Sequence, residues 1–556
     1  MNKKNYVAVA TLAFAMLTSC AGQKEAKSTS GIDLANMDTT VSAGTDFFRY
    51  ACGGWNDAHP LTAEYSRYGT FDELFENSQK QLRELIEGLA AQKNNQAGSA
   101  AQKIGDLYNM AMDSVTLNKQ GAEPVKAMLD KIAGMKDKSE IVPMMTEMAH
   151  IGIGTYFHSY VYADPKNSSL NIFQMGQGGI NLGEKEYYLD TDSITQNIRE
   201  QYKLYIGKLF QLAGFSEADA QQKVADVMEI ETAIAKVSRS ATELRDPEAN
   251  YHKMSFDELK KTIAGIDWDA YMKGLGIQAP AELNVEQVEP IQEVARLMNT
   301  LPLSKHVSYL EYNLLDAAAS CLSDDFVAAR FDFYGKVLSG RQVNQPRWKR
   351  AVNSVNGMLG ELVGEMYVEK YFPAAAKERM VKLVKNLQTA LGERIDAQEW
   401  MSDSTKIRAH EKLATFHVKV GYPDKWKDYS KLEIKNDSYW ANVCRASEWG
   451  FNDMYSRIGK PVDKDEWLMT PQTVNAYYNP STNEICFPAA ILQPPFFNME
   501  ADDAANYGAI GVVIGHEMTH GFDDQGRQFD KDGNLTDWWA PGDADRFKER
   551  AQVMVD

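Results

Sequence analysis

Residues 516–520 read His516-Glu517-Met518-Thr519-His520, an HExxH motif. Two histidines four positions apart lie on one face of a helix, about one turn apart, so both imidazoles can reach one metal ion. Glu517 lies beside that face, where its carboxylate can take a proton from a metal-bound water. The motif therefore predicts one Zn²⁺ per chain, with His516 and His520 as ligands and Glu517 as the general base. The alternative is a pair of hydrogen-bonded histidines in a protein core.

The residues just before the motif predict a buried helix. Glycines at positions 508, 511 and 515 alternate with isoleucine and valine. Glycine weakens an exposed helix by about 1 kcal/mol relative to alanine, so three glycines at helical spacing favour a smooth stripe for close packing. Apolar residues run most of the way round, which is typical of a buried helix. Gly521 follows the motif as a helix stop.

Hydrophobic spacing elsewhere predicts a mainly α protein with a small β component. Apolar residues recur every three or four positions in residues 78–91, 100–112, 198–212, 219–237 and 380–391. Alternation predicts strands at 155–163 and 169–174, and a buried strand at 484–487. Residues 541–555 form another amphipathic segment. Residues 530–534 resemble a calcium loop, but Gln528 and Trp539 occupy the positions where an EF-hand needs acids, so we expect a turn.

Bulk properties narrow the function only slightly. The chain has 556 residues, 44% of them hydrophobic, and a net charge of −18. An acidic chain of this kind argues against nucleic-acid binding, which needs a basic surface. The cysteines beyond residue 20 are far apart and form no metal cluster. Cys486 lies in an apolar run and is expected to be a buried free thiol.

The first twenty residues predict an export signal. Lys3 and Lys4 precede a short apolar run that is too short for a permanent membrane helix. Leu17-Thr18-Ser19-Cys20 resembles a bacterial lipobox, so residues 1–19 are expected to be a lipoprotein signal peptide and Cys20 the lipidated N-terminus. Residues 20–35 would be a flexible tether. We expect an exported protein anchored to the lipid bilayer, facing the periplasm or the outside; plain secretion is the alternative.

Ten segments in conserved order resemble the neprilysin family of zinc endopeptidases, most closely its bacterial members related to endopeptidase O. They read ACGGW (51–55), RYGTFD (67–72), EYYL (186–189), RDP (245–247), WKR (348–350), MYVE (366–369), VNAYYNP (474–480), FPAAILQPPFF (487–497), GFDD (521–524) and DWW (537–539). The resemblance implies a two-lobed, monomeric protein whose central cavity admits short peptides. Residues 36–71 and 401–556 would form a thermolysin-like catalytic lobe, and residues 72–400 a helical cap lobe.

The same resemblance assigns roles to individual residues. Asp523 resembles the carboxylate that orients a ligand histidine. Asn475 and Ala476 resemble the edge segment that hydrogen-bonds the substrate backbone. Arg67 resembles a contact for the C-terminal side of the substrate. The apolar pocket for the residue after the scissile bond would be lined by Ile491, Phe496, Val513 and Phe71, which would also serve as ordinary core.

The departures from the family concern the third zinc ligand. In the family it is a glutamate of an ExxxD motif downstream of HExxH, and no such motif follows here. The only later glutamate is Glu549, which is expected to be a solvated helix charge. We therefore expect a truncated zinc endopeptidase that cleaves peptides before bulky hydrophobic residues when complete and is nearly inactive as this chain. Alternatives are a catalytically degenerate peptide-binding surface lipoprotein and a structural surface lipoprotein.

Overall fold

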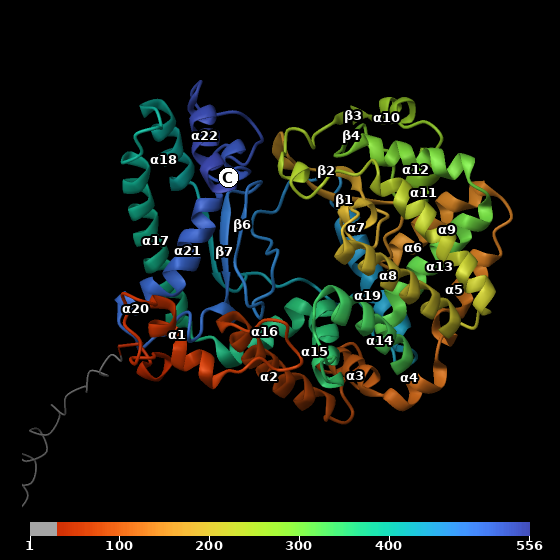
Figure 1. Cartoon of the computed structure of the whole chain (residues 1–556), viewed down its shortest axis with the longest axis horizontal. Helices are drawn as coiled ribbons and strands as arrows, with labels where there is room; N and C mark the ends of the chain where they lie inside the picture. The colour runs from red at the N-terminus through yellow and green to blue at the C-terminus, as the bar shows by residue number, and fades with distance from the viewer. Residues whose placement is uncertain (1–29) are drawn as a thin grey trace, which may run out of the picture.

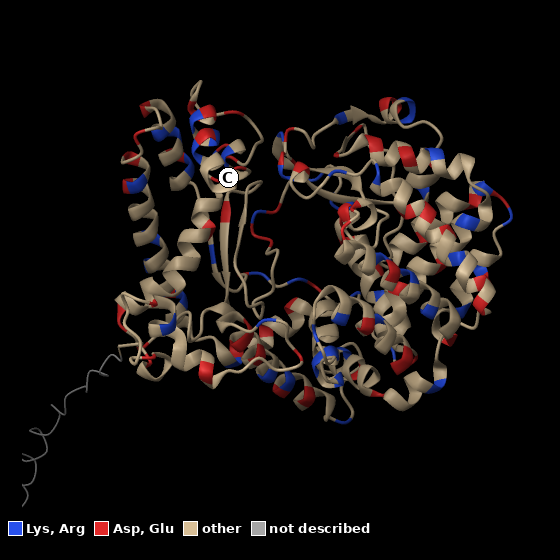
Figure 2. Ribbon diagram, in the orientation of Figure 1, with Lys and Arg blue, Asp and Glu red and all other residues tan. Residues whose placement is uncertain are grey.

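A computed structural model describes residues 30–556, which form two lobes side by side (Figure 1). Cys20 and the signal peptide lie outside the described residues. Within them, no helix is both long enough and apolar enough to cross a membrane. Acidic and basic residues are interspersed along the ribbon of both lobes (Figure 2).

The cap lobe is a group of helices packed around one sheet. Its larger helices are α3 (Ala100–Met112), α5 (Glu123–Ala133), α6 (Ile141–His150), α8 (Ser193–Leu212), α9 (Glu217–Ala235), α12 (Val288–Thr300), α13 (Leu303–Ala318) and α19 (Tyr439–Tyr455). Shorter helices are α4 (Ser114–Gln120), α7 (Glu186–Leu189), α10 (Phe256–Thr262), α11 (Trp268–Gly274) and α14 (Asp324–Arg330), the last followed by a π-helix at Phe331–Leu338. Helix α13 packs against α5, α8 and α9.

The cap-lobe sheet has the strand order β1-β2-β4-β3. Its strands are β1 (Phe157–Asp164), β2 (Asn167–Gln177), β3 (Lys253–Ser255) and β4 (Glu282–Val285). Strands β1 and β2 form an antiparallel hairpin, while β2 and β4 run parallel. The tip of this hairpin reaches the other lobe, where Pro165 and Ser168 form hydrogen bonds with it.

The other lobe, which the resemblance predicts to be catalytic and which keeps the name catalytic lobe below, contains a three-stranded sheet with helices beside it. The strands are β5 (His417–Gly421), β6 (Tyr477–Asn479) and β7 (Glu484–Pro488), in the order β5-β7-β6. The helices are α17 (Ala374–Asp396), α18 (Asp403–Ala414), α20 (Asp503–Gly508), α21 (Ile510–His520) and α22 (Asp543–Val555). Helix α21 packs against α17 and α20 and contacts strand β6. Cys486 is a fully buried free thiol on β7, as predicted.

A group of helices connects the two lobes along one side (Figure 1), with α1 (Phe47–Ala58) at its N-terminal end. Helix α2 (Thr70–Ala90) packs against α3, α15 (Arg347–Met358) and α16 (Gly360–Tyr371). The expected lobe boundary at residue 400 differs from this packing. Helix α17 precedes it but packs against α18, α21 and β5, whereas α19 follows it but packs against α3, α6 and β1. Apolar faces, not sequence order, decide which lobe a helix joins.

Most elements predicted from hydrophobic spacing are present, but the helix of the HExxH motif differs from its prediction. It is not buried all round, because Val512 is 65% exposed while Ile510, Ile514 and Met518 on the opposite side are fully buried. The glycine stripe does not provide close packing either. A Cβ atom added at Gly508 or Gly515 would meet no atom within 4 Å among the described residues. The apolar sequence therefore forms a helix that is buried on one side and exposed on the other.

The cap-lobe hairpin tip and one ion pair join the lobes near α21. Pro165 accepts a hydrogen bond from the backbone N–H of Leu535 (2.6 Å), and the N–H of Ser168 donates to Asn534 Oδ1 (2.9 Å). The two contacts reach Asn534 at the end of segment 530–534 and Leu535 just after it. This segment is a turn as predicted, because Phe529 and Leu535 pair across it. Arg245 and Asp524 form a two-pronged ion pair at 2.6 and 2.8 Å.

Candidate metal centre

The motif helix begins after a break in the chain direction. Helix α20 ends at Gly508, and Ala509 between the helices has φ −113° and ψ −90°, outside the helical region. The buried side of α21 packs onto α17, so the helix is held along its length while its other side stays open. Helix α21 therefore presents the two histidines on a fixed support.

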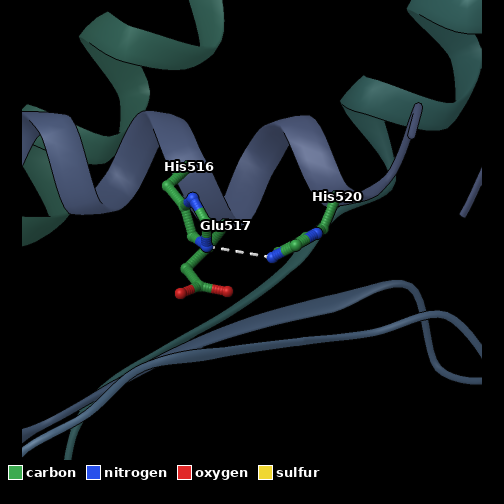
Figure 3. A group of neighbouring side chains, drawn as sticks. All are labelled: His516, Glu517 and His520. Carbon is green, nitrogen blue, oxygen red and sulfur yellow. Dashed lines mark hydrogen bonds between the residues drawn. The ribbon is translucent and has the colours of Figure 1, made fainter. Parts of the chain in front are cut away.

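The two histidine side chains converge on one point (Figure 3). Their Nε2 atoms lie 3.0 Å apart, and the rings meet edge-on at 81°. Two nitrogens bound to one tetrahedral zinc are about 3.3 Å apart, given Zn–N bonds of roughly 2.0–2.1 Å. The pair thus needs only a small adjustment to hold an ion. Within residues 30–556, the only cluster of metal-binding side chains consists of His516, Glu517 and His520, with ligand atoms within 4.8 Å of one another.

Asp523 fixes the orientation of His520. Its Oδ2 lies 2.8 Å from His520 Nδ1, while its Oδ1 accepts hydrogen bonds from the backbone N–H groups of Gln525 and Gly526 at 3.0 and 2.7 Å. Because Nδ1 must carry the proton to donate to the carboxylate, Nε2 of the neutral ring keeps its lone pair for a metal. The donor set fits Zn²⁺, and Asp523 lies where the family resemblance placed it.

Glu517 is the buried member of the cluster. Its side chain is on the sheet side of α21 (Figure 3), and the residue is only 6% exposed. Burial raises the pKa of Glu517, whereas the two histidines and a hydrogen bond with the backbone of Tyr478 act in the opposite direction. A carboxylate with a raised pKa beside a metal site is suited to accept a proton from water.

The predicted backbone-binding segment leads into the edge strand of the catalytic-lobe sheet. Asn475 is exposed and Ala476 is buried, and β6 begins at the next residue. Among the described strands, β6 pairs only with β7, so its other edge is unpaired. Helix α21 contacts this strand, which places an open strand edge beside the histidines.

The apolar residues predicted to line a substrate pocket are only partly brought together. The rings of Phe71 and Phe496 lie 4.5 Å apart although they come from distant parts of the chain. Phe71 is 46% exposed and Val513 is half-buried. Ile491 has no exposed surface, so in this structure it belongs to the hydrophobic core and cannot itself touch a peptide. Arg67 is exposed on the segment that leads into α2.

Sequence reasoning missed Lys412, the most unusual charged residue near the motif. Its side chain is 1% exposed and donates to three backbone carbonyl oxygens directly after α21. One signal was present: Thr405, Ala409 and Lys412 are spaced as one face of α18, and all are buried. A lysine on the buried face of an amphipathic helix is rare without a partner.

The comparisons with known proteins place these features in a family. Models of peptidase family M13 match residues 43–423 and 475–556. This chain belongs to peptidase family M13. Endothelin-converting enzyme 1 of Rattus norvegicus is 33% identical to it over 94% of the chain and 70% of that protein. The neprilysin-family resemblance read from the sequence is therefore confirmed, and the chain is a zinc metalloendopeptidase by family.

Solved structures agree on the fold and the metal. The Mycobacterium tuberculosis zinc metalloprotease Zmp1, in complex with an inhibitor, superimposes with a TM-score of 0.90 at 38% identity and covers 95% of this chain and 80% of its own. PepO from Lactobacillus rhamnosis HN001 has a TM-score of 0.82 at 23% identity, covering 90% of this chain and 79% of its own, and supports the fold alone. The mainly helical fold and zinc as the M13 cofactor are thus confirmed.

Proposed function

We propose that His516 and His520 bind the zinc ion of an endopeptidase in which Glu517 is the general base. The observation that carries this proposal is the convergence of both Nε2 atoms, 3.0 Å apart, beside a buried carboxylate. The alternative of two hydrogen-bonded core histidines fits less well, because His516 is exposed and His520 is half-buried.

The side chains of the site have separate roles in peptide hydrolysis. When bound, Zn²⁺ supplies a Lewis acid that polarises the peptide carbonyl and acidifies water. Glu517 takes the proton of the attacking water and can pass it to the leaving nitrogen. Asp523 holds the proton on Nδ1 of His520 and so keeps Nε2 available. Asn475 and Ala476 hold the substrate backbone along the open edge of β6, which aligns it with Glu517.

The third zinc ligand is proposed to come from none of residues 30–556. Glu549 is exposed on α22 and is not part of the histidine cluster. Two imidazoles leave zinc with fewer than the three protein ligands usual for catalytic sites. We therefore expect weak zinc binding and little or no turnover from the 556-residue chain, and an active enzyme only where a further ligand is supplied.

Zinc binding tests the site directly. The 556-residue protein is loaded with zinc, and its metal content and X-ray absorption spectrum are measured. We expect one zinc per chain with two histidine nitrogens, and loss of the ion in His520→Ala but not in His410→Ala, a half-buried histidine of the same lobe that pairs with Asp396. Zinc retained equally by both variants would refute the site and favour the peptide-binding or structural lipoprotein reading. A third protein ligand in the spectrum would point to Glu549.

The substrates are proposed to be short peptides cleaved on the amino side of bulky hydrophobic residues. The ring pair Phe71–Phe496 and half-buried Val513 supply an apolar surface. In a form of the protein that carries its third ligand, a peptide library should show this preference. Val513→Ala should weaken it by about 10-fold, since lost methyl groups in such a pocket are worth ~1–3 kcal/mol. Val512→Ala removes the same atoms at a 65% exposed position and should change nothing.

The protein is further proposed to be an exported lipoprotein. The support is the sequence Leu17-Thr18-Ser19-Cys20 after an apolar run. Mass spectrometry of membrane-extracted protein should find an acylated Cys20 as the N-terminus. Cleavage at another position, giving a product without lipid, would exclude the anchor.

A further inference from the structure

Directly after the motif helix, the chain forms an irregular segment whose backbone carbonyls bind the side chain of a single lysine. Lys412 Nζ donates to the carbonyl oxygens of Gly521, Gly526 and Phe529 at 2.7, 2.6 and 2.6 Å. The residues between them, 521–529, will be called the post-motif loop. The rings of Tyr478, Phe522 and Trp538 surround the ammonium at 5.7–5.9 Å from its nitrogen. All three N–H donors of the ammonium are therefore used by one loop.

Burying this ammonium is costly. Lys412 is 1% exposed and forms no salt bridge with any described residue. Burial lowers the pKa of its amine to about 7, although the carboxylates of Asp530 and Asp523 act in the opposite direction. A buried charge without an opposite charge destabilises a fold by several kcal/mol before its hydrogen bonds are counted. An apolar side chain of the same length would fill this space with less desolvation. The arrangement is therefore best explained by what the three hydrogen bonds hold in place.

What they hold is the support of His520. Gly526 donates its backbone N–H to Asp523 Oδ1 at 2.7 Å, while its own carbonyl oxygen accepts from Lys412. Asp523 Oδ2 in turn contacts His520 Nδ1 at 2.8 Å. The loop also lies against the motif helix itself, since a Cβ atom at Gly526 would stand 1.8 Å from the carbonyl oxygen of His520. A continuous path of hydrogen bonds thus links Lys412 to the imidazole.

We propose that Lys412 is a positioning residue for the zinc site, fixing the post-motif loop so that Asp523 holds His520 in the metal-binding orientation. This inference rests on the zinc function proposed above and deepens it. Lys412 also caps the C-terminal end of α21 through Gly521, where a cation is favoured by the helix dipole. A protonated amine carries three N–H donors on one nitrogen, one for each carbonyl, whereas a neutral amine has only two and a shorter side chain does not reach.

A buried lysine in the cap lobe provides a matched control. Lys103 is 3% exposed and donates to a single carbonyl, that of Tyr429, at 2.6 Å. Lys103→Met and Lys412→Met both remove a buried ammonium, and both are expected to change the midpoint of urea unfolding. Only Lys412→Met should affect the zinc site. Lys412→Arg keeps the charge but not the geometry, and serves if the methionine variant does not fold.

The experiment has one arm with zinc and one without. In the metal-free protein, hydrogen exchange of peptides covering 521–529 should speed up in Lys412→Met and not in Lys103→Met. With zinc, competition against a chelator should show about 10-fold weaker binding in Lys412→Met, the lower range for loss of a group that supports a metal ligand. Lys103→Met should change zinc affinity less than 2-fold, on the same order as experimental error.

A double-mutant cycle shows whether the effect passes through Asp523. Adding Lys412→Met to Asp523→Asn should weaken zinc binding little further, because the path to His520 is already broken. If Lys412→Met weakened zinc binding as much in the Asp523→Asn protein as in the unmodified one, its effect would not pass through Asp523. That result, or equal zinc affinity of Lys412→Met and Lys103→Met, would mean that Lys412 only stabilises the fold. Unchanged exchange in the post-motif loop would overturn the inference outright. Failure of the unmodified protein to bind zinc would refute the proposed function, while the metal-free arm would still decide whether Lys412 holds the loop.

Discussion

Each lobe buries an ionisable group that forms no salt bridge with another residue of 30–556, and the two groups are surrounded very differently. In the catalytic lobe, Lys412 binds three backbone carbonyls of one irregular loop. In the cap lobe, Glu231 is fully buried and accepts hydrogen bonds from the side chains of Tyr188 (2.6 Å), Tyr202 (2.9 Å) and Asn181 (2.6 Å). The lysine fixes a loop next to the histidines, whereas the glutamate fastens cap-lobe side chains to each other.

This difference distinguishes a buried group that supports metal binding, Lys412, from one that supports the stability of the fold, Glu231. The post-motif loop has little regular structure, so its shape depends on Lys412 and Asp523. The partners of Glu231 come partly from α7 and α8, whose apolar packing already fixes their positions. Substitutions in the catalytic lobe should therefore change metal binding and turnover, and those at Glu231 should change stability and its pH dependence.

The largest effect is expected at Glu517, which tests the chemical side of the comparison. Glu517→Gln keeps the size of the buried side chain but removes the base. In a form of the protein that cleaves peptides, kcat should fall by ~10²–10⁴-fold, the usual contribution of such a group. Zinc content and the unfolding midpoint should stay nearly unchanged. Near-normal turnover in this variant would remove Glu517 from the mechanism.

The next effect concerns stability in the cap lobe. Burial raises the pKa of Glu231 to about 7, against the opposing hydrogen bonds from Tyr188, Asn181 and Tyr202. The titratable groups interacting with it are tyrosines, namely Tyr188, Tyr202, Tyr309, Tyr312 and Tyr334. Between the ordinary carboxyl pKa and 7, the folded state keeps a proton that the unfolded state loses. The free energy of unfolding should therefore fall by about 3 kcal/mol as pH rises through this window.

Urea unfolding at pH 5 and pH 8 measures that loss. Glu231→Gln cannot ionise, so this part of the pH dependence should disappear while zinc affinity stays the same. The exposed Glu369→Gln serves as the control and should keep the wild-type pH dependence. An unchanged slope in Glu231→Gln would mean that the carboxyl is ionised in the folded protein. Loss of zinc binding in Glu231→Gln would instead show that the cap lobe influences the zinc site.

The sequence predicted the regular parts of both lobes better than the groups just compared. The HExxH spacing identified the ligand pair, and residues 100–112 form a helix with the predicted bounds. The open side of α21 and the exchange of α17 and α19 between lobes depend on tertiary packing, which local patterns do not encode. Lys412 was missed because the carbonyl oxygens that accept its hydrogen bonds carry no sequence signature, and its place on the buried face of α18 was the one signal available. Ile491 was predicted to line the pocket because a family motif does not distinguish a residue at the pocket surface from a buried residue next to it.

The smallest effect is expected at the ion pair that joins the lobes near α21, and it tests whether they act separately. Arg245 and Asp524 are 50% and 52% exposed, so their attraction is screened by water and salt. Arg245→Ala should lower the free energy of unfolding by less than ~1 kcal/mol, and less at high salt. Lys166→Ala is the control, because its pair with Glu248 is similarly exposed but lies within the cap lobe. Equal small losses in the free energy of unfolding of the two variants would indicate that the lobes act independently. A larger loss in Arg245→Ala, accompanied by weaker zinc binding, would show that contact between the lobes also helps to order the post-motif loop through Asp524, next to Asp523.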